Sequence, residues 1–153
     1  MKSYVVFSDI HGDVYAKKIL QEYVKNSDGA FFAGDGLSGL NDFTKKPFYA
    51  VMGNCDRVGD EEKIIEVDGV KILLTHGHLY GVKSSYLRLI YKAKELGVDV
   101  VIFGHTHQPI IMQEEEILLL NPGSCSIYGA QKTFINLFIS NNKASAVINQ
   151  LEK

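Results

Sequence analysis

The stretch VDVVIFGHTHQP, Val98 to Pro109, places two histidines directly after a run of β-branched and apolar residues. VDVVIF (98–103) is typical of a buried β-strand, and Gly104 ends it in a turn. His105 and His107 stand two residues apart, so on a strand they would share one face. A histidine near a strand end is usually a hydrogen-bonded structural residue, so this pair alone is weak evidence. Its meaning depends on how the other strands end.

Four other apolar segments also end in polar turns that carry histidine, aspartate or asparagine. These turns are Asp9-Ile10-His11-Gly12, Gly34-Asp35-Gly36, Gly53-Asn54-Cys55-Asp56 and Thr75-His76-Gly77-His78. Together with Gly104-His105-Thr106-His107 they contain all five histidines of the chain. Structural histidines scattered through a core would not gather in this way. Since ligands of open α/β sheets lie beyond the carboxyl ends of strands, the pattern predicts one site built from these turns.

The remaining segments predict an α/β (α+β) fold with helices outside two mixed sheets that pack face to face. Helices are expected at 14–25, capped by Asp13, and at 84–96, capped by Ser84 or Ser85. The turn Asp68-Gly69 predicts a tight hairpin between 63–67 and 70–76. The first part alternates strands and helices, whereas the last third indicates an antiparallel meander. The other expected strands are 3–8, 29–33, 47–52, 109–113, 116–120, 132–140 and 144–151.

Size and composition indicate a globular chain of 153 residues that forms a single domain, 1–153. A net charge of −2 gives no strong nucleic-acid signal and no attraction to an anionic membrane. The amino-terminal apolar run is too short for a signal peptide, and no segment is long enough to span a bilayer. Only Cys55 and Cys125 occur, which argues against a disulfide framework and favours a cytoplasmic protein.

The ligand types in the turns point to divalent metal ions. Imidazoles, carboxylates and a carboxamide suit Mn²⁺, Fe, Zn²⁺, Co²⁺ or Ni²⁺ better than a thiolate-type structural zinc site. A tetrahedral structural site needs four ligands, so a larger set fits two metal ions that share one carboxylate. The seven candidate ligands are Asp9, His11, Asp35, Asn54, His76, His105 and His107.

In this order the motifs D-x-H, G-D, G-N, H and G-H-x-H resemble those of the calcineurin-like metallophosphoesterase superfamily. GNCD, THGH and the later Asn121-Pro122-Gly123-Ser124 resemble its small single-domain bacterial and archaeal branch. The resemblance implies a four-layer α/β/β/α sandwich with a dinuclear centre, in which Asp35 bridges two ions and Mn²⁺ is favoured over Ni²⁺, Fe²⁺, Zn²⁺, Co²⁺ or Mg²⁺. One ion would be held by Asp9, His11, Asp35 and His107, and the other by Asp35, Asn54, His76 and His105.

The implied reaction is hydrolysis of a small phosphate ester by in-line attack of a hydroxide that the two ions generate. Asn54 and the Asn121–Ser124 turn would lie near the phosphate, and Cys55, His78 and Arg57 are further candidates to contact it. Larger members have a histidine after the motif asparagine, where this chain has Cys55, and a thiol is a poor general acid. Leaving-group protonation is then open between His78, Asp56 and water, which favours phosphodiesters over alkyl phosphomonoesters.

A non-catalytic scaffold is the alternative, because the same branch resembles the retromer cargo-sorting subunit, which uses this fold for protein contacts. That subunit lacks part of the ligand set, whereas all seven positions are filled here, and this favours catalysis. Edge strands in the carboxy-terminal part leave a homodimer open.

Overall fold

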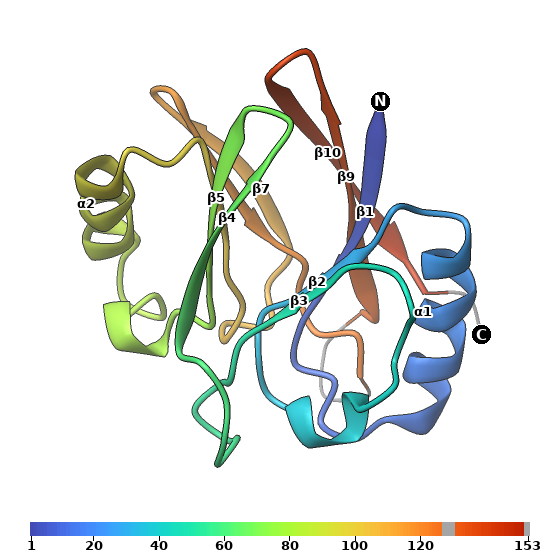
Figure 1. Cartoon of the computed structure of the whole chain (residues 1–153). Helices are drawn as coiled ribbons and strands as arrows, with labels where there is room; N and C mark the ends of the chain where they lie inside the picture. Colours follow the sequence, from blue (N-terminus) through green and yellow to red (C-terminus); the bar gives the residue numbers. More distant parts are fainter. Residues whose placement is uncertain (127–130, 152–153) are drawn as a thin grey trace.

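The computed structural model describes residues 1–126 and 131–151, and its strands form two mixed five-stranded sheets (Figure 1). The first sheet contains β1 (Lys2–Phe7), β2 (Ala30–Phe32), β3 (Phe48–Ala50), β9 (Thr133–Ser140) and β10 (Lys143–Gln150). Their order is β10-β9-β1-β2-β3. β1, β2 and β3 run parallel, whereas β9 lies antiparallel to both β1 and β10.

The second sheet contains β4 (Glu62–Val67), β5 (Val70–Thr75), β6 (Val100–Ile102), β7 (Ile110–Glu114) and β8 (Ile117–Asn121). Their order is β4-β5-β6-β8-β7, with β5, β6 and β8 parallel. Val67 pairs with Val70 across the β4–β5 hairpin, so Asp68 and Gly69 form the predicted two-residue turn.

The two sheets pack face to face, and one helix covers the outer face of each (Figure 1). α1 (Val14–Lys25) packs on the first sheet and α2 (Leu87–Leu96) on the second. Successive residues of β1 alternate between interfaces, because side chains on a strand point to opposite faces. Tyr4 and Val6 face the second sheet, whereas Val5 and Phe7 face α1. The predicted four-layer α/β/β/α sandwich is therefore confirmed.

α1 begins and ends where the sequence predicts. The Asp13 carboxylate accepts a hydrogen bond from the Ala16 backbone N–H at 3.0 Å, as an N-cap residue should. Ala16, Leu20 and Val24, spaced by four residues, are the buried side chains of this helix. This helix fixes the loop 9–13 that precedes it.

Two predictions about the later elements were wrong. α2 begins at Leu87 and not at residue 84, because Ser84 and Ser85 donate their backbone N–H groups to the Gly81 carbonyl in a separate turn. The expected antiparallel meander is instead divided between the sheets. β7 and β8 form a hairpin in the second sheet, and β9 and β10 form another in the first.

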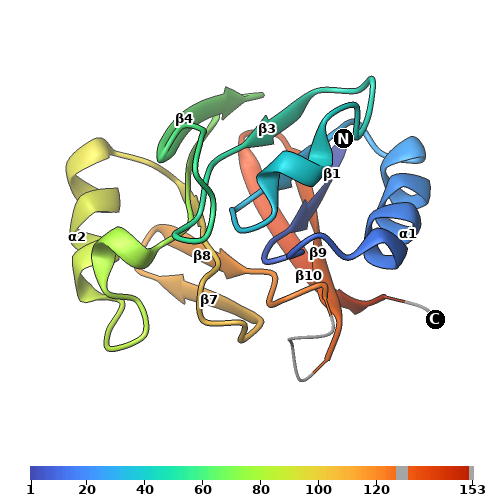
Figure 2. The ribbon, with the colours of Figure 1, turned by 90° about the horizontal axis from the view of Figure 1, so that it is seen from below.

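The carboxyl ends of the parallel strands of both sheets meet at one end of the sandwich (Figure 2). The polar turns that follow β1, β2, β3, β5 and β6 all lie there, together with the short 3₁₀ helices η1 (Leu37–Leu40) and η2 (His78–Tyr80). The site is thus assembled from both sheets. Across the described residues, neither α-helix has the length and apolar character to cross a membrane.

Candidate metal centre

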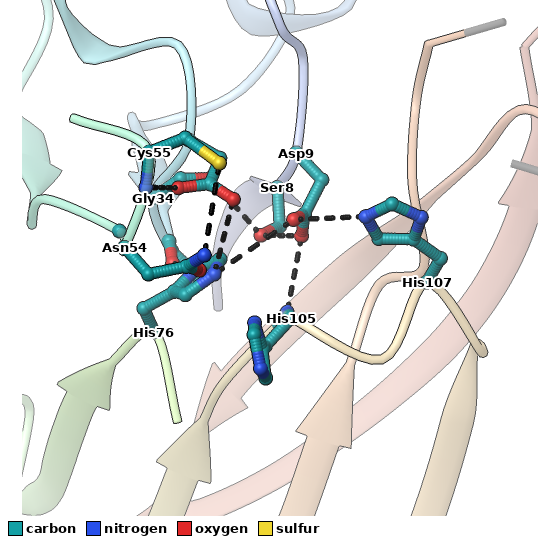
Figure 3. Close-up of polar contacts among 12 residues, drawn as sticks. Ser8, Asp9, Gly34, Asn54, Cys55, His76, His105 and His107 are labelled. Carbon is teal, nitrogen blue, oxygen red and sulfur yellow. Dashed lines mark hydrogen bonds and ion pairs between the residues drawn. The ribbon is translucent and has the colours of Figure 1, made fainter. Parts of the chain in front are cut away.

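The Asp9 carboxylate lies at the middle of the histidine cluster (Figure 3). Its Oδ2 accepts hydrogen bonds from Ser8 Oγ at 2.5 Å and from the His105 backbone N–H at 3.2 Å. Its Oδ1 is buried and makes no hydrogen bond with the described residues. Three imidazole nitrogens surround this oxygen, with His107 Nε2 at 3.2 Å, His11 Nε2 at 3.8 Å and His76 Nε2 at 3.9 Å.

This arrangement fits a cation. Nitrogen and oxygen ligands about 2.0–2.2 Å from a divalent metal lie roughly 3–3.5 Å from one another. The separations around Asp9 Oδ1 are in or just above that range, and a buried carboxylate oxygen without a donor is costly unless a positive charge satisfies it. Burial raises the pKa of Asp9, although His76, Ser8 and His107 oppose this.

Asp35 follows β2 and presents its carboxylate in the same way. Its Oδ1 accepts a hydrogen bond from the Cys55 backbone N–H at 2.8 Å, and its Oδ2 lies 3.3 Å from His76 Nε2. His76 Nδ1 donates to the Ala33 carbonyl at 2.7 Å, so the ring turns Nε2 towards the two carboxylates. Burial alone would raise the pKa of Asp35, but hydrogen bonds from His76 and Cys55 hold it well below its usual range.

The two histidines of the Gly104–His107 turn face different neighbours. The His107 ring lies 5.7 Å from that of His11, whereas the His105 ring lies 5.0 Å from that of His76. The His78 ring is close to the second group, 5.4 Å from His76 and 6.1 Å from His105. Burial and the nearby His76 lower the pKa of His105 to about 4, so its imidazole is neutral and able to bind a metal at neutral pH.

The backbone is strained where the ligands are. Left-handed φ values occur at five of the seven candidate ligands: Asp9 (54°), His11 (47°), Asp35 (69°), His105 (72°) and His107 (62°). Such a conformation costs a residue with a Cβ roughly 1–2 kcal/mol. Strain of this kind is typical of functional sites, where the surrounding structure imposes it to aim a side chain.

Two glycines allow the turns to approach the carboxylates. A Cβ at Gly53 would collide with the Asp35 carboxylate, and a Cβ at Gly104 would collide with Ser8 Oγ and lie 2.7 Å from Asp9 Oδ2. Any larger residue at either position would therefore displace a candidate ligand.

Asp56, one of the candidate proton donors, is occupied with backbone contacts. Its Oδ2 accepts from the N–H groups of Asp35 at 2.8 Å and Gly53 at 2.9 Å. Its Oδ1 accepts from Gly36 at 2.8 Å and Leu37 at 3.1 Å. Both oxygens of this carboxylate are therefore engaged by backbone N–H groups of the surrounding turns and are not directed at a leaving group. These contacts favour a role in joining the turn after β2 to the turn after β3.

The other candidate substrate contacts surround the cluster. Asn54 and Cys55 are exposed, with Asn54 Nδ2 3.6 Å from Cys55 Sγ. Burial and the charge of Asp35 raise the pKa of the Cys55 thiol. His78 is half-buried, and burial and His76 lower its pKa. Arg57 is exposed and makes no hydrogen bond or ion pair within 1–126 and 131–151.

The sequence analysis missed one supporting residue, Ser8, and did not foresee the contacts of two others, Asn121 and Ser124. Ser8 holds Asp9 Oδ2, as described above, and its only sequence signal is its place before the aspartate. Asn121 belongs to the quoted Asn121–Ser124 motif but serves the histidine turn, since its Nδ2 donates to the Gly104 carbonyl at 3.1 Å and to Thr106 Oγ1 at 3.0 Å. Ser124 Oγ donates to the Asp9 carbonyl at 2.8 Å. The Asn121–Ser124 motif therefore supports the cluster both at the Gly104–His107 turn and at Asp9.

Comparison with known proteins gives the class to which this fold and site belong. Residues 1–142 match the Calcineurin-like phosphoesterase superfamily domain, and the chain therefore belongs to that superfamily. Membership supports a metal-dependent phosphoesterase.

Named relatives agree with this class. The chain is 35% identical to the probable metallophosphoesterase YsnB of Bacillus subtilis, over 84% of this chain and 78% of that protein. It is 30% identical to the phosphodiesterase YfcE of Escherichia coli, over 78% and 77% of the two chains. A crystal structure of a predicted phosphoesterase from Streptococcus pneumoniae superposes with a TM-score of 0.81 at 28% identity, covering 97% of this chain and 89% of that one.

Proposed function

We propose that this protein is a phosphodiesterase that uses two divalent metal ions held by Asp9, His11, Asp35, Asn54, His76, His105 and His107. The observation that carries the proposal is the buried Asp9 Oδ1, which has no hydrogen-bond donor among the described residues and faces three imidazole nitrogens. The division of the histidines into a group with His107 and a group with His105 supports two ions rather than one.

Two ions bound here would supply an acidified water as nucleophile and positive charge for the phosphate oxygens. The chain's own residues fix the geometry. Ser8 and the His105 N–H hold one oxygen of Asp9, and the Cys55 N–H holds one oxygen of Asp35, so each carboxylate offers its other oxygen to the centre. The Ala33 carbonyl orients His76 in the same sense.

The preference for diesters rests on the lack of a good proton donor at this site among residues 1–126 and 131–151. The thiol of Cys55 has a raised pKa, and both oxygens of the Asp56 carboxylate are engaged by four backbone N–H groups. His78 has a lowered pKa, so its imidazole is neutral at neutral pH. An alkyl phosphomonoester has a poor leaving group that needs a proton, whereas an aryl or otherwise activated diester does not.

The test is a panel of metals and substrates on metal-stripped protein. Hydrolysis of bis-p-nitrophenyl phosphate and p-nitrophenyl phosphate would be measured with Mn²⁺, Ni²⁺, Fe²⁺, Mg²⁺ and Zn²⁺. We expect activity only with added metal, with Mn²⁺ favoured and the diester preferred. A much faster reaction with the monoester would overturn the diester preference, and activity without metal would overturn the mechanism.

The alternative is a protein-binding scaffold without turnover. A metal-loaded protein that hydrolyses none of a set of mono-, di- and cyclic phosphate esters would favour it. The filled ligand set and the strained backbone at five of its members argue for catalysis, since a scaffold has no need to maintain that strain.

A further inference from the structure

Cys55 places a sulfur atom at the edge of the metal centre. Ligand atoms of His11, Asp35 and Cys55 lie within 4.8 Å of one another, and His11 and Asp35 are also candidate ligands of the proposed ions. The thiol is not a solitary group on the surface, because the Asn54 amide donates to it at 3.6 Å and its own backbone N–H holds Asp35. Figure 3 shows the Cys55 sulfur joined by a dashed line to the Asn54 amide.

A second observation, the one that carries the proposed function, points to a cation beside the same His11 ring. Asp9 Oδ1 is fully buried and lacks a hydrogen-bond donor among the described residues, and it lies 3.8 Å from the same His11 ring. His11 therefore lies near both a buried carboxylate oxygen that lacks a donor and a thiol that can bind a cation. Asn54 adds to this arrangement, since its Nδ2 points to the sulfur and its carbonyl oxygen is left as its ligand atom.

Cys125 provides an internal comparison. It is the second thiol of the chain, but it is completely buried among apolar side chains, and its S–H donates to the Ser8 carbonyl at 3.4 Å. It belongs to none of the groups of ligand atoms found in the described residues. One cysteine thus has the surroundings of a metal ligand, and the other has those of a core residue.

We propose that Cys55 is a conditional metal ligand, which joins His11 and Asp35 around a thiophilic ion such as Zn²⁺ or Cd²⁺ and stays unbound when the site holds Mn²⁺ or Mg²⁺. Thiolates select Zn²⁺ and softer ions, whereas Mn²⁺ and Mg²⁺ prefer oxygen and water. When the sulfur–metal bond forms, the S–H bond breaks and its proton passes to solvent, with no change of oxidation state. The proposal takes its metal centre from the proposed function and extends it to metal selectivity.

The functional consequence is that a thiophilic metal ion would be left without an open coordination position for water or substrate. A catalytic zinc site keeps a coordination position open for water or substrate, and a structural site fills every position with protein ligands. A bound Cys55 sulfur would occupy such a position. Zn²⁺ would then bind tightly and support little hydrolysis, whereas Mn²⁺ would bind with the position open.

The first test detects the sulfur–metal bond directly and does not depend on turnover. Co²⁺ would be added to metal-stripped protein and the near-ultraviolet spectrum recorded, because a thiolate ligand gives an intense sulfur-to-cobalt absorption that nitrogen and oxygen ligands do not give. We expect this band in the wild type and in Cys125→Ser, and its loss in Cys55→Ser. Circular dichroism would verify that all three proteins are folded.

Metal affinities provide the second measurement. Loss of a partner outside the coordination sphere already weakens metal binding about 10-fold or more, so loss of a direct ligand should cost Zn²⁺ at least that much in Cys55→Ser. Mn²⁺ affinity should be unchanged in the same variant. Cobalt uptake without the band in wild type, or a band that survives in Cys55→Ser, would overturn this proposal and leave the phosphodiesterase intact. Failure to bind cobalt at all would also overturn this proposal, whereas the phosphodiesterase would be overturned only if Mn²⁺ failed to bind and to support hydrolysis as well.

Discussion

The Gly104–His107 turn contacts the two oxygens of Asp9 in different ways. The His105 backbone N–H donates to Oδ2 at 3.2 Å, and His107 Nε2 lies 3.2 Å from Oδ1. The two histidines therefore have one backbone contact and one side-chain contact with the same carboxylate, although their rings face different neighbours. The His105 ring is thereby free to serve a second group of ligands beside His76.

This division predicts how metal is lost from single variants. We expect His107→Ala to lose the ion bound with Asp9 and His11, and His105→Ala to lose the ion bound with Asn54 and His76. Each variant should retain one Mn²⁺ per chain where the wild type holds two, as measured by elemental analysis after gel filtration. The double variant should hold none. If either single substitution removed both ions, or neither, the two-group arrangement would be contradicted.

Asp56 should act on metal binding through the backbone. In Asp56→Asn an NH₂ group replaces one carboxylate oxygen and faces two of the N–H groups that Asp56 now satisfies. We expect metal affinity to fall about 10–100-fold, the usual effect of losing a supporting partner, together with a lower melting temperature. Calorimetric titration with Mn²⁺ would measure the fall in metal affinity.

Asp60→Asn is the matched control for that variant. Asp60 is exposed, and among the described residues its carboxylate pairs with Lys63 alone, at 3.6 Å, so its substitution should leave affinity and melting temperature unchanged. Equal behaviour of the two variants would show that the contacts of Asp56 are not needed to hold the site.

Gly53→Ala tests the close approach of the turn to Asp35. The added Cβ would collide with the Asp35 carboxylate and lie 2.7 Å from its backbone nitrogen, so the carboxylate must move away from the centre. We expect metal binding and hydrolysis to be lost. Gly39→Ala, whose Cβ would meet nothing within 4 Å, should keep both and gain about 0.4–1 kcal/mol of stability. Full activity of Gly53→Ala would refute this account of the turn.

His105 gives a pH dependence whose sign follows from its lowered pKa. Above about pH 6.5 the imidazole is neutral in both the folded and unfolded chains, so it contributes nothing to the difference between them. Between 6.5 and about 4 the unfolded chain takes up a proton that the folded chain does not, so the metal-free protein loses stability as pH falls through this window. Below about pH 4 this loss is complete.

Thermal melts of metal-stripped protein at a series of pH values would measure this loss of stability. Relative to wild type, His105→Gln should become progressively more stable as pH falls from 6.5 to 4, and the difference should be constant above 6.5. A difference that does not vary with pH would mean that His105 keeps an ordinary pKa in the folded chain.

Much of the fold followed from local pattern. Apolar runs that stop at polar turns located the strands, and the helical spacing of apolar residues behind Asp13 predicted α1 to the residue. The start of α2 was placed too early because Ser84 and Ser85 form a separate turn on the Gly81 carbonyl, and Ser85 Oγ accepts from the N–H of Leu87, the first residue of the helix. Of the expected meander, the β7–β8 and β9–β10 pairs are antiparallel as predicted. Which sheet each would join depends on contacts with β6 and β1, and no local pattern records them.

The candidate site was likewise only partly predictable from the sequence. Residue types and order singled out the candidate ligands, because imidazole and carboxylate at strand ends have few structural uses. The contacts that aim them lie far apart in sequence, as between His105 and Asp9 or Ser124 and Asp9. Asp56 could not be assigned from sequence either, since an acidic side chain beside a ligand looks like a catalytic group until its four N–H partners are known.

The left-handed backbone at Asp9, His11, Asp35, His105 and His107 has an evolutionary consequence. Aspartate tolerates this conformation, but glycine or asparagine would fit it better than histidine does at His11, His105 and His107, so selection for metal binding keeps the three imidazoles in place. A lineage released from that selection would lose backbone strain with each such replacement. Its first substitutions should fall at these three positions, with glycine and asparagine common among them, whereas Asp9 and Asp35 should persist longer because backbone and hydroxyl donors depend on their carboxylates.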